Sequence, residues 1–212
     1  MGYPSCWIGS DEVGKGDYLG PLVVAAVCLK AGDAAKAGEL GIKDSKKVTD
    51  KKALALAKEI EALWPAAVVM INPSKYNELQ QKMKNINKLL TWAHGQALAN
   101  LLDKGVHPEA WVVDQFGDEE YLRREVERRA KGLKLIQRVR AEDDPAVAAA
   151  SVLARAYFLR RMDSLSKEFG VTLHKGAGTP TDASAQAFVA KHGVSALGNV
   201  AKLHFKNTQR VG

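Results

Sequence analysis

The sequence predicts an α/β fold with a mixed central sheet flanked by helices and a helical C-terminal region. Two apolar runs follow each other near the beginning of the chain, and later apolar runs alternate with segments of helical spacing. Strands in succession, followed by strands that alternate with helices, are typical of a mixed sheet covered by helices. Because no repeat, linker or low-complexity tract interrupts the pattern, we expect residues 1–212 to form one domain.

Five short apolar runs predict the strands. The first breaks at the acidic pair Asp11 and Glu12, and a glycine-bearing turn separates it from the second, so that these two strands are expected to be neighbours. The fourth run is closed by Asp114. In chain order the predicted strands are 6–10, 22–29, 66–71, 110–113 and 133–139.

Segments with apolar residues at helical spacing predict the helices. Thr49 is the expected N-cap of the first helix, after a Gly- and Ala-rich connection over 31–41 and a lysine-rich loop. A long helix rich in small residues begins at Pro145. In chain order the predicted helices are 49–64, 74–83, 87–102, 118–131, 145–169 and 182–192, followed by an irregular basic tail.

Composition narrows the class of protein. The chain has 212 residues, of which 46% are hydrophobic, and this suits a folded domain with a sizeable core. The net charge of +7 favours polyanionic partners, although an ordinary basic surface has the same composition. The longest apolar stretch, 21–29, is too short to span a bilayer, so we expect a cytoplasmic protein without a membrane partner. Cys6 and Cys28 are expected to be buried thiols, not a disulfide or a metal site.

Three groups of acidic residues stand where ordered segments begin or end. Asp11 and Glu12 follow one apolar strand and Asp114 ends another, so that neighbouring strands would bring three carboxylates together. The cluster 142–144 precedes the long helix, where the helix dipole favours negative charge. Each acid alone can equally be the cap of a turn or a helix, and the spacing does not by itself place them side by side.

Clustered carboxylates predict a site for a hard cation, because they repel one another unless such an ion lies between them. Oxygen ligands favour Mg²⁺ and argue against zinc, and no Cys or His group has zinc-finger spacing. Two ions roughly 4 Å apart would activate a water and stabilise the leaving oxygen of a phosphodiester displacement.

A turn of sequence Gly14-Lys15-Gly16 follows the first acidic pair. Its backbone amides can approach a sugar or phosphate while the ammonium neutralises charge, but a plain structural turn is an equal alternative. His174 and His204 are expected to be surface or hydrogen-bonded histidines more than catalytic helpers. Further phosphate contacts are expected from about half of a wider basic and polar set, which comprises Lys43, Ser45, Lys46, Lys47, Lys82, Lys84, Asn85, Asn87, Lys88, Lys202, Lys206 and Arg210.

Taken together, the motifs resemble those of ribonuclease HIII, in the ribonuclease HII/HIII family of type 2 ribonucleases H. The opening motif is GSDEVGKGDYLGPL over 9–22, and ribonuclease HII usually carries Arg in place of Lys15. Other family-like segments follow in the same order over nearly the whole chain, namely 44–47, 83–88, 113–116, 146–155 and 175–178.

This resemblance implies a ribonuclease-H-like fold and hydrolysis of the RNA strand of RNA–DNA hybrids, giving 3′-hydroxyl and 5′-phosphate ends with two Mg²⁺ or Mn²⁺ ions. The family's acidic quartet corresponds to Asp11, Glu12, Asp114 and Glu142 as catalytic residues and metal ligands. Asp143 is an alternative fourth ligand, because the stretch that follows is one residue shorter than the family pattern. The implied substrate-binding residues are Gly14, Lys15, Gly16, Ser45, Lys46, Lys47, Asn85, Asn87, Lys88, Ser151 and Lys175, with the Gly-Lys-Gly turn sensing the 2′-hydroxyl.

The resemblance concerns the catalytic domain alone. Typical ribonucleases HIII carry an additional N-terminal domain that resembles the TATA-box-binding protein, whereas here the catalytic motif begins within the first dozen residues, so we expect weaker hybrid binding with the chemistry retained. A monomer that needs no protein partner is implied. Three alternatives remain, namely incision at single ribonucleotides in duplex DNA, a non-catalytic hybrid- or RNA-binding module, and a DNA strand-transfer enzyme of the same broad fold.

Overall fold

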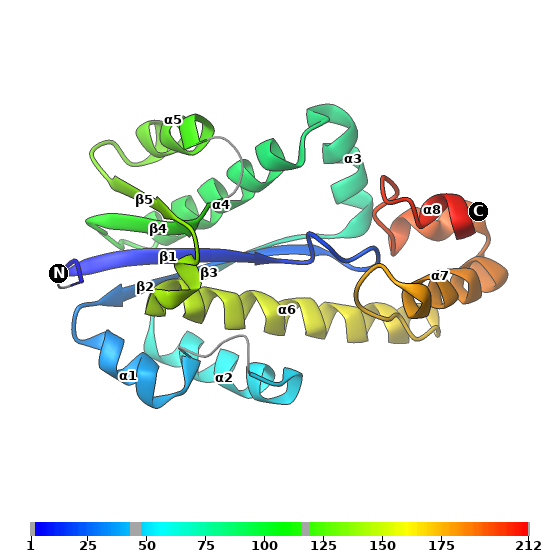
Figure 1. Cartoon of the computed structure of the whole chain (residues 1–212), viewed down its shortest axis with the longest axis horizontal. Helices are drawn as coiled ribbons and strands as arrows, with labels where there is room; N and C mark the ends of the chain where they lie inside the picture. The colour runs from blue at the N-terminus through cyan, green and yellow to red at the C-terminus, as the bar shows by residue number, and fades with distance from the viewer. Residues whose placement is uncertain (1–2, 43–47, 116–118, 212) are drawn as a thin grey trace. The chain divides into compact units, whose positions relative to one another are not determined.

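The computed structural model describes residues 3–42, 48–115 and 119–211 (Figure 1). The chain divides into two compact units, and each is described by itself. The first contains Met1–Glu12, Val24–Val69 and Asn85–Ala156, and the second contains Val13–Val23, Met70–Lys84 and Tyr157–Gly212. That 1–212 form a single domain stays a prediction.

The five predicted strands form one mixed sheet, in the order β3-β2-β1-β4-β5. β1 pairs in parallel with β4, with Ser10 opposite Val113, and β4 pairs in parallel with β5. The prediction that the first strand ends at Ser10 was wrong, because β1 continues through both acids to Val13. The strands are β1 (Cys6–Val13), β2 (Leu22–Lys30), β3 (Ala66–Ile71), β4 (Ala110–Asp114) and β5 (Lys134–Arg138).

The predicted helices are all present, and the Thr49 hydroxyl caps the first long one by accepting from the Lys52 amide at 3.3 Å. The connection over 31–41 contains an unpredicted short helix, α1 (Asp33–Glu39), and the tail is less irregular than expected, since it contains η3 (Val194–Asn199) and α8 (Thr208–Val211). The other helices are α2 (Asp50–Leu63), α3 (Pro73–Met83), α4 (Ile86–Leu102), α5 (Glu119–Arg129), η2 (Ala141–Asp143), α6 (Pro145–Phe169) and α7 (Thr179–His192).

Helices α4 and α6 pack on opposite faces of β1, as the side chains of that strand show. Successive strand residues point to opposite faces. A Cβ on Gly9 would lie 2.2 Å from the Val147 amide nitrogen at the beginning of α6, whereas the Ser10 hydroxyl lies 2.8 Å from Nδ1 of His94 in α4. Figure 1 shows α4 and the beginning of α6 on either side of the sheet. Asp11 therefore shares the α6 face with Gly9, and Glu12 shares the α4 face with Ser10.

The beginning of α6 is fixed to the sheet by Asp144. Its Oδ1 accepts from the Ala146 amide at 2.9 Å, which caps the helix, and from Nε1 of Trp7 at 3.0 Å. Both Asp144 and Trp7 are buried. Trp7 precedes Gly9 by two positions in β1, so the same strand face carries this anchor and the close contact at Gly9.

Cys6 and Cys28 are free thiols with their Sγ atoms 3.3 Å apart. Cys28 is buried, as the sequence predicted, whereas Cys6 is only half-buried. Within the three described ranges, no helix is both long and apolar enough to cross a membrane.

Candidate active site

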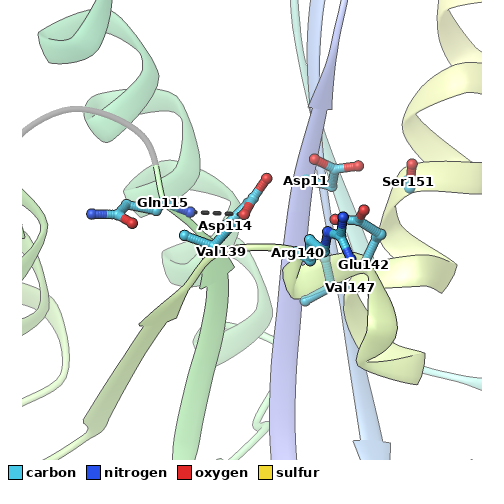
Figure 2. A pocket seen from close by; sticks show the side chains of 8 residues that line it. All are labelled: Asp11, Asp114, Gln115, Val139, Arg140, Glu142, Val147 and Ser151. Atoms are coloured by element: carbon cyan, nitrogen blue, oxygen red, sulfur yellow. Dashed lines mark hydrogen bonds between the residues drawn. The ribbon is translucent and has the colours of Figure 1, made fainter.

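A pocket of about 460 Å³ lies in the first unit, where β1 and β4 carry their acids (Figure 2). Ser10 is opposite Val113 in the parallel pair, so Asp11 and Asp114 are the next residues of neighbouring strands. The structure thus brings these two acids, which are distant in sequence, to one place. The lining residues are Asp11, Asp114, Gln115, Val139, Arg140, Glu142, Val147 and Ser151.

Asp11 is an acid of this pocket with a raised pKa. Burial first, and the negative charge of Glu12 second, raise the pKa from 3.8 to about 6, while a hydrogen bond with the Ser151 side chain opposes both effects. A carboxylate that is costly to ionise in this way is stabilised when a cation lies beside it. Ser151, which the resemblance assigned to substrate binding, lines the same pocket from α6.

Asp114 is held in place by backbone amides. Its Oδ1 accepts from the Gln115 amide at 2.9 Å and from the Ala141 amide at 3.4 Å. Ala141 begins the short helix that carries Glu142, so this carboxylate connects the end of β4 to the segment that supplies the next acid.

Glu142 and Asp143 differ in where they lie. Glu142 is half-buried and lines the pocket, whereas Asp143 is exposed and does not line it. This placement favours Glu142 over Asp143 as the partner of Asp11 and Asp114.

Glu12 does not line the pocket. Its Oε2 lies 3.3 Å from Nε2 of His94, which is fully buried on the α4 face. The Ser10 hydroxyl contacts Nδ1 of the same ring at 2.8 Å and accepts from Nε1 of Trp111 at 2.9 Å. When Glu12 is ionised it only accepts hydrogen bonds, so the ring nitrogen of His94 that faces it then carries the proton.

The donor set fits a hard divalent cation, although it is not arranged as a finished cage. The acids of the pocket offer only oxygen ligands, which suit Mg²⁺ and Mn²⁺. Among the residues that the structure describes, no three His, Cys, Asp or Glu side chains meet closely enough to hold an ion as they stand.

The Gly14-Lys15-Gly16 turn lies in the second unit, and its backbone needs glycine at position 14. Gly14 has φ +98°, and a Cβ there would lie 2.1 Å from the Pro21 carbonyl oxygen. The turn is joined to the loop of Lys175, because the Gly176 amide donates to Oδ1 of Asp17 at 2.6 Å and the Tyr18 amide donates to the Gly176 carbonyl at 2.8 Å. Lys15 and Lys175 are both exposed.

Other residues of the predicted basic and polar set lie in different surroundings. The Asn85 side chain caps α4 by accepting from the amides of Asn87 and Lys88, and the Lys88 ammonium lies 5.5 Å from the centre of the Tyr121 ring. Lys202 is fully buried, so the expectation that it contacts phosphate was wrong. Lys43, Ser45, Lys46 and Lys47 lie outside the described residues.

Two residues near the carboxylates, His94 and Arg140, were not predicted as functional. His94 acts through a contact between distant segments, which no local motif indicates. Asp144, which belonged to the predicted acidic cluster, is instead the cap of α6. Arg140 lines the pocket and has φ +57°, a left-handed conformation that is uncommon outside glycine. His174 is exposed, and His204 stacks on Tyr76 at 5.5 Å between ring centres, in keeping with the modest roles expected of both.

Comparison of the whole chain with known proteins shows that this site, with acids on two parallel strands beside a helix of small residues, belongs to a nuclease of the ribonuclease H type. The family model described as Ribonuclease HII matches residues 8–208, and the chain belongs to this family.

Within the ribonuclease HII family, the curated proteins that resemble this chain include ribonucleases HIII. That of Protochlamydia amoebophila is 42% identical over 96% of this chain and 67% of its own length, and that of Bacillus licheniformis is 41% identical over 96% and 66%. A crystal structure of Bst-RNase HIII in complex with Mn²⁺ superimposes with a TM-score of 0.90 at 36% identity, covering 97% of this chain and 68% of the other. The predicted ribonuclease-H-like fold is therefore confirmed, and the chain spans about two thirds of the length of these relatives.

Proposed function

We propose that the chain is an endonuclease that hydrolyses the RNA strand of RNA–DNA hybrids and leaves 3′-hydroxyl and 5′-phosphate ends. The observation that carries this proposal is the pocket that Asp11, Asp114 and Glu142 line, together with membership of the ribonuclease HII family. The relatives are named ribonuclease HIII. This name supports cleavage of RNA–DNA hybrids over the alternative functions considered from the sequence.

Asp11, Asp114 and Glu142 are the proposed ligands of Mg²⁺ or Mn²⁺, with Glu12 as the fourth acid of the site. The Mn²⁺ complex of Bst-RNase HIII supports a divalent cation. When bound, two such ions would supply an activated water and stabilise the charge on the leaving oxygen.

The protein's own groups position the cations and the scissile strand. The backbone amides that bond Asp114 fix its orientation, and His94 does the same for Glu12. Ser151 bonds Asp11 and faces the pocket, where it is placed to contact the RNA strand. The amides and the ammonium of Gly14-Lys15-Gly16, with Lys175 beside them, are proposed to hold a ribose-phosphate group and to read its 2′-hydroxyl.

The test is a gel assay with an end-labelled hybrid and Mg²⁺ or Mn²⁺. Asp11→Asn should abolish cleavage while hybrid binding persists, whereas the control Asp163→Asn, an exposed acid on α6 paired with Lys167, should cleave normally. Binding without cleavage by the unmodified protein would support a hybrid-binding module instead. Preferential cutting of a DNA duplex that contains a single ribonucleotide, compared with the hybrid, would contradict the proposed specificity for hybrids.

We further propose a monomer that acts in the cytoplasm without an obligate protein partner. Sedimentation of the chain with and without hybrid tests the monomeric state. A dimer at the concentrations used for cleavage would contradict it.

A further inference from the structure

Lys202 is a lysine with no exposed surface. Its Nζ donates to the carbonyl oxygens of Asp17 and Gly20, at 2.7 Å each, and lies 5.7 Å from the centre of the Tyr76 ring. All four residues belong to the second unit. A lysine is rarely buried so completely, because the loss of hydration is costly.

The two carbonyls belong to the segment that directly follows Gly14-Lys15-Gly16. The Asp17 amide donates to the Gly14 carbonyl at 3.3 Å, which closes the turn, and Gly20 has φ +85°. Two carbonyl oxygens directed at one point repel each other unless a donor lies between them. The Lys202 amine is that donor, so it fixes the backbone on the far side of the turn.

The main chain around Lys202 strengthens the same connection. The Lys202 amide donates to the Tyr18 carbonyl at 2.9 Å, and the Gly20 amide donates to the Val200 carbonyl at 2.8 Å. The 17–20 segment is therefore held by 200–202 on one side and by Gly176 on the other. A purely apolar residue would fill the space beside Tyr76, but it would leave both carbonyls without their donor.

The protonation state of Lys202 does not alter this geometry. Burial lowers its pKa to about 7, and the nearby charge of Asp17 opposes that effect. The neutral amine has two N–H groups and the ammonium has three, so either form can serve both carbonyls.

We propose that Lys202 is a positioning residue for substrate recognition, which acts through the 17–20 segment to hold Gly14-Lys15-Gly16 in the conformation that binds the ribose-phosphate of the RNA strand. The inference rests on the proposed function and adds a residue that does not itself touch the substrate. It also reverses the role expected from the sequence, in which Lys202 was a surface contact to phosphate.

The test begins with Lys202→Met, which keeps the length of the side chain and removes its N–H groups. We expect KM for the hybrid to rise about tenfold with kcat within about twofold, because the lost bonds hold the binding turn and not the carboxylates. The matched control is Lys191→Met, which removes an exposed lysine that also donates to a backbone carbonyl of the second unit, that of Gly170. Its KM should be unchanged.

A double-mutant cycle with Lys15→Ala separates positioning from general destabilisation. If Lys202 acts through the turn, Lys202→Met should change KM less than about twofold once Lys15 is gone. An equal factor in both backgrounds would overturn the proposal, as would an unchanged KM in folded Lys202→Met. Lys202→Gln, which keeps an NH₂ group, replaces Lys202→Met in the cycle if the latter does not fold. Failure of both to fold would also overturn it, since Lys202 would then be required for folding.

Failure of this inference is distinguishable from failure of the proposed function. An unmodified protein that does not cleave the hybrid refutes the proposed function, and the inference falls with it. An unmodified protein that cleaves, with a KM that Lys202→Met leaves unchanged, refutes only the role of Lys202.

Discussion

Replacement of Asp11 by Asn should make the metal-free protein more stable at neutral pH while it abolishes cleavage. Burial, and then the charge of Glu12, raise the pKa of Asp11 from 3.8 to about 6. The folded protein therefore holds the proton more tightly than the unfolded chain does. Below about pH 4 the carboxyl is protonated in both states and costs nothing, and its cost to folding grows as pH rises and is complete above about pH 6.

The difference between the pKa of Asp11 in the unfolded chain, 3.8, and in the folded protein, about 6, corresponds to a cost to folding of about 3 kcal/mol. Solvent screening in the open pocket reduces this cost to about 1–2 kcal/mol. Urea unfolding with EDTA should show Asp11→Asn more stable than the unmodified protein by that amount at pH 7.5, and equal to it at pH 4. The control Asp163→Asn alters an exposed carboxylate and should show no such gain. Equal stability of Asp11→Asn and the unmodified protein at pH 7.5, or a gain that persists at pH 4, would refute the reasoning.

Three further substitutions test the supports of the site. Asp144→Ala should lower the free energy of unfolding by about 2–4 kcal/mol in urea, because it removes the cap of α6 and leaves the buried Trp7 N–H without an acceptor, whereas Asp144→Asn should lose less. Gly9→Ala should cost about 3 kcal/mol or more in thermal unfolding, because its Cβ would lie 2.2 Å from a backbone atom of α6. His94→Leu should lower the cleavage rate about 10–100-fold, and His94→Gln, whose amide can replace the ring N–H toward Glu12, should lower it less.

Each of these predictions has its own control. Gly38→Ala in α1 introduces a Cβ that meets nothing within 4 Å and should not destabilise the protein. An Asp144→Ala protein as stable as Asp144→Asn would show that the Trp7 bond contributes little. For His94, equal rates in the Gln and Leu variants would show that the N–H toward Glu12 is not what matters.

The sequence predicts the strands well because each is a short apolar run between polar turns, and Asp11 and Asp114 meet because two of those runs pair in parallel. It misplaces the end of β1. The acidic residues predict that the strand stops before them, whereas the strand continues in the sheet to Val13. It misses α1, whose Ala-rich segment carries a weak signal between two stronger elements.

The parts of the site that the sequence does not predict depend on contacts across long separations. His94 faces Glu12 only because α4 packs on one face of β1, and nothing in the local sequence of α4 indicates that partner. Lys202 looks like one basic residue among several in the tail, and only its burial against Asp17 and Gly20 shows that it is an internal donor.

The alternation of β1 makes the position of its acids sensitive to chain length. Trp7, Gly9 and Asp11 face α6, while Ser10 and Glu12 face α4. Insertion of one residue between Gly9 and Asp11 would turn every later side chain of the strand to the other side, so that Asp11 would point at His94 and Glu12 would enter the pocket. A change of one residue in the length of β1 therefore exchanges the surroundings of Asp11 and Glu12, which no single replacement along the strand does.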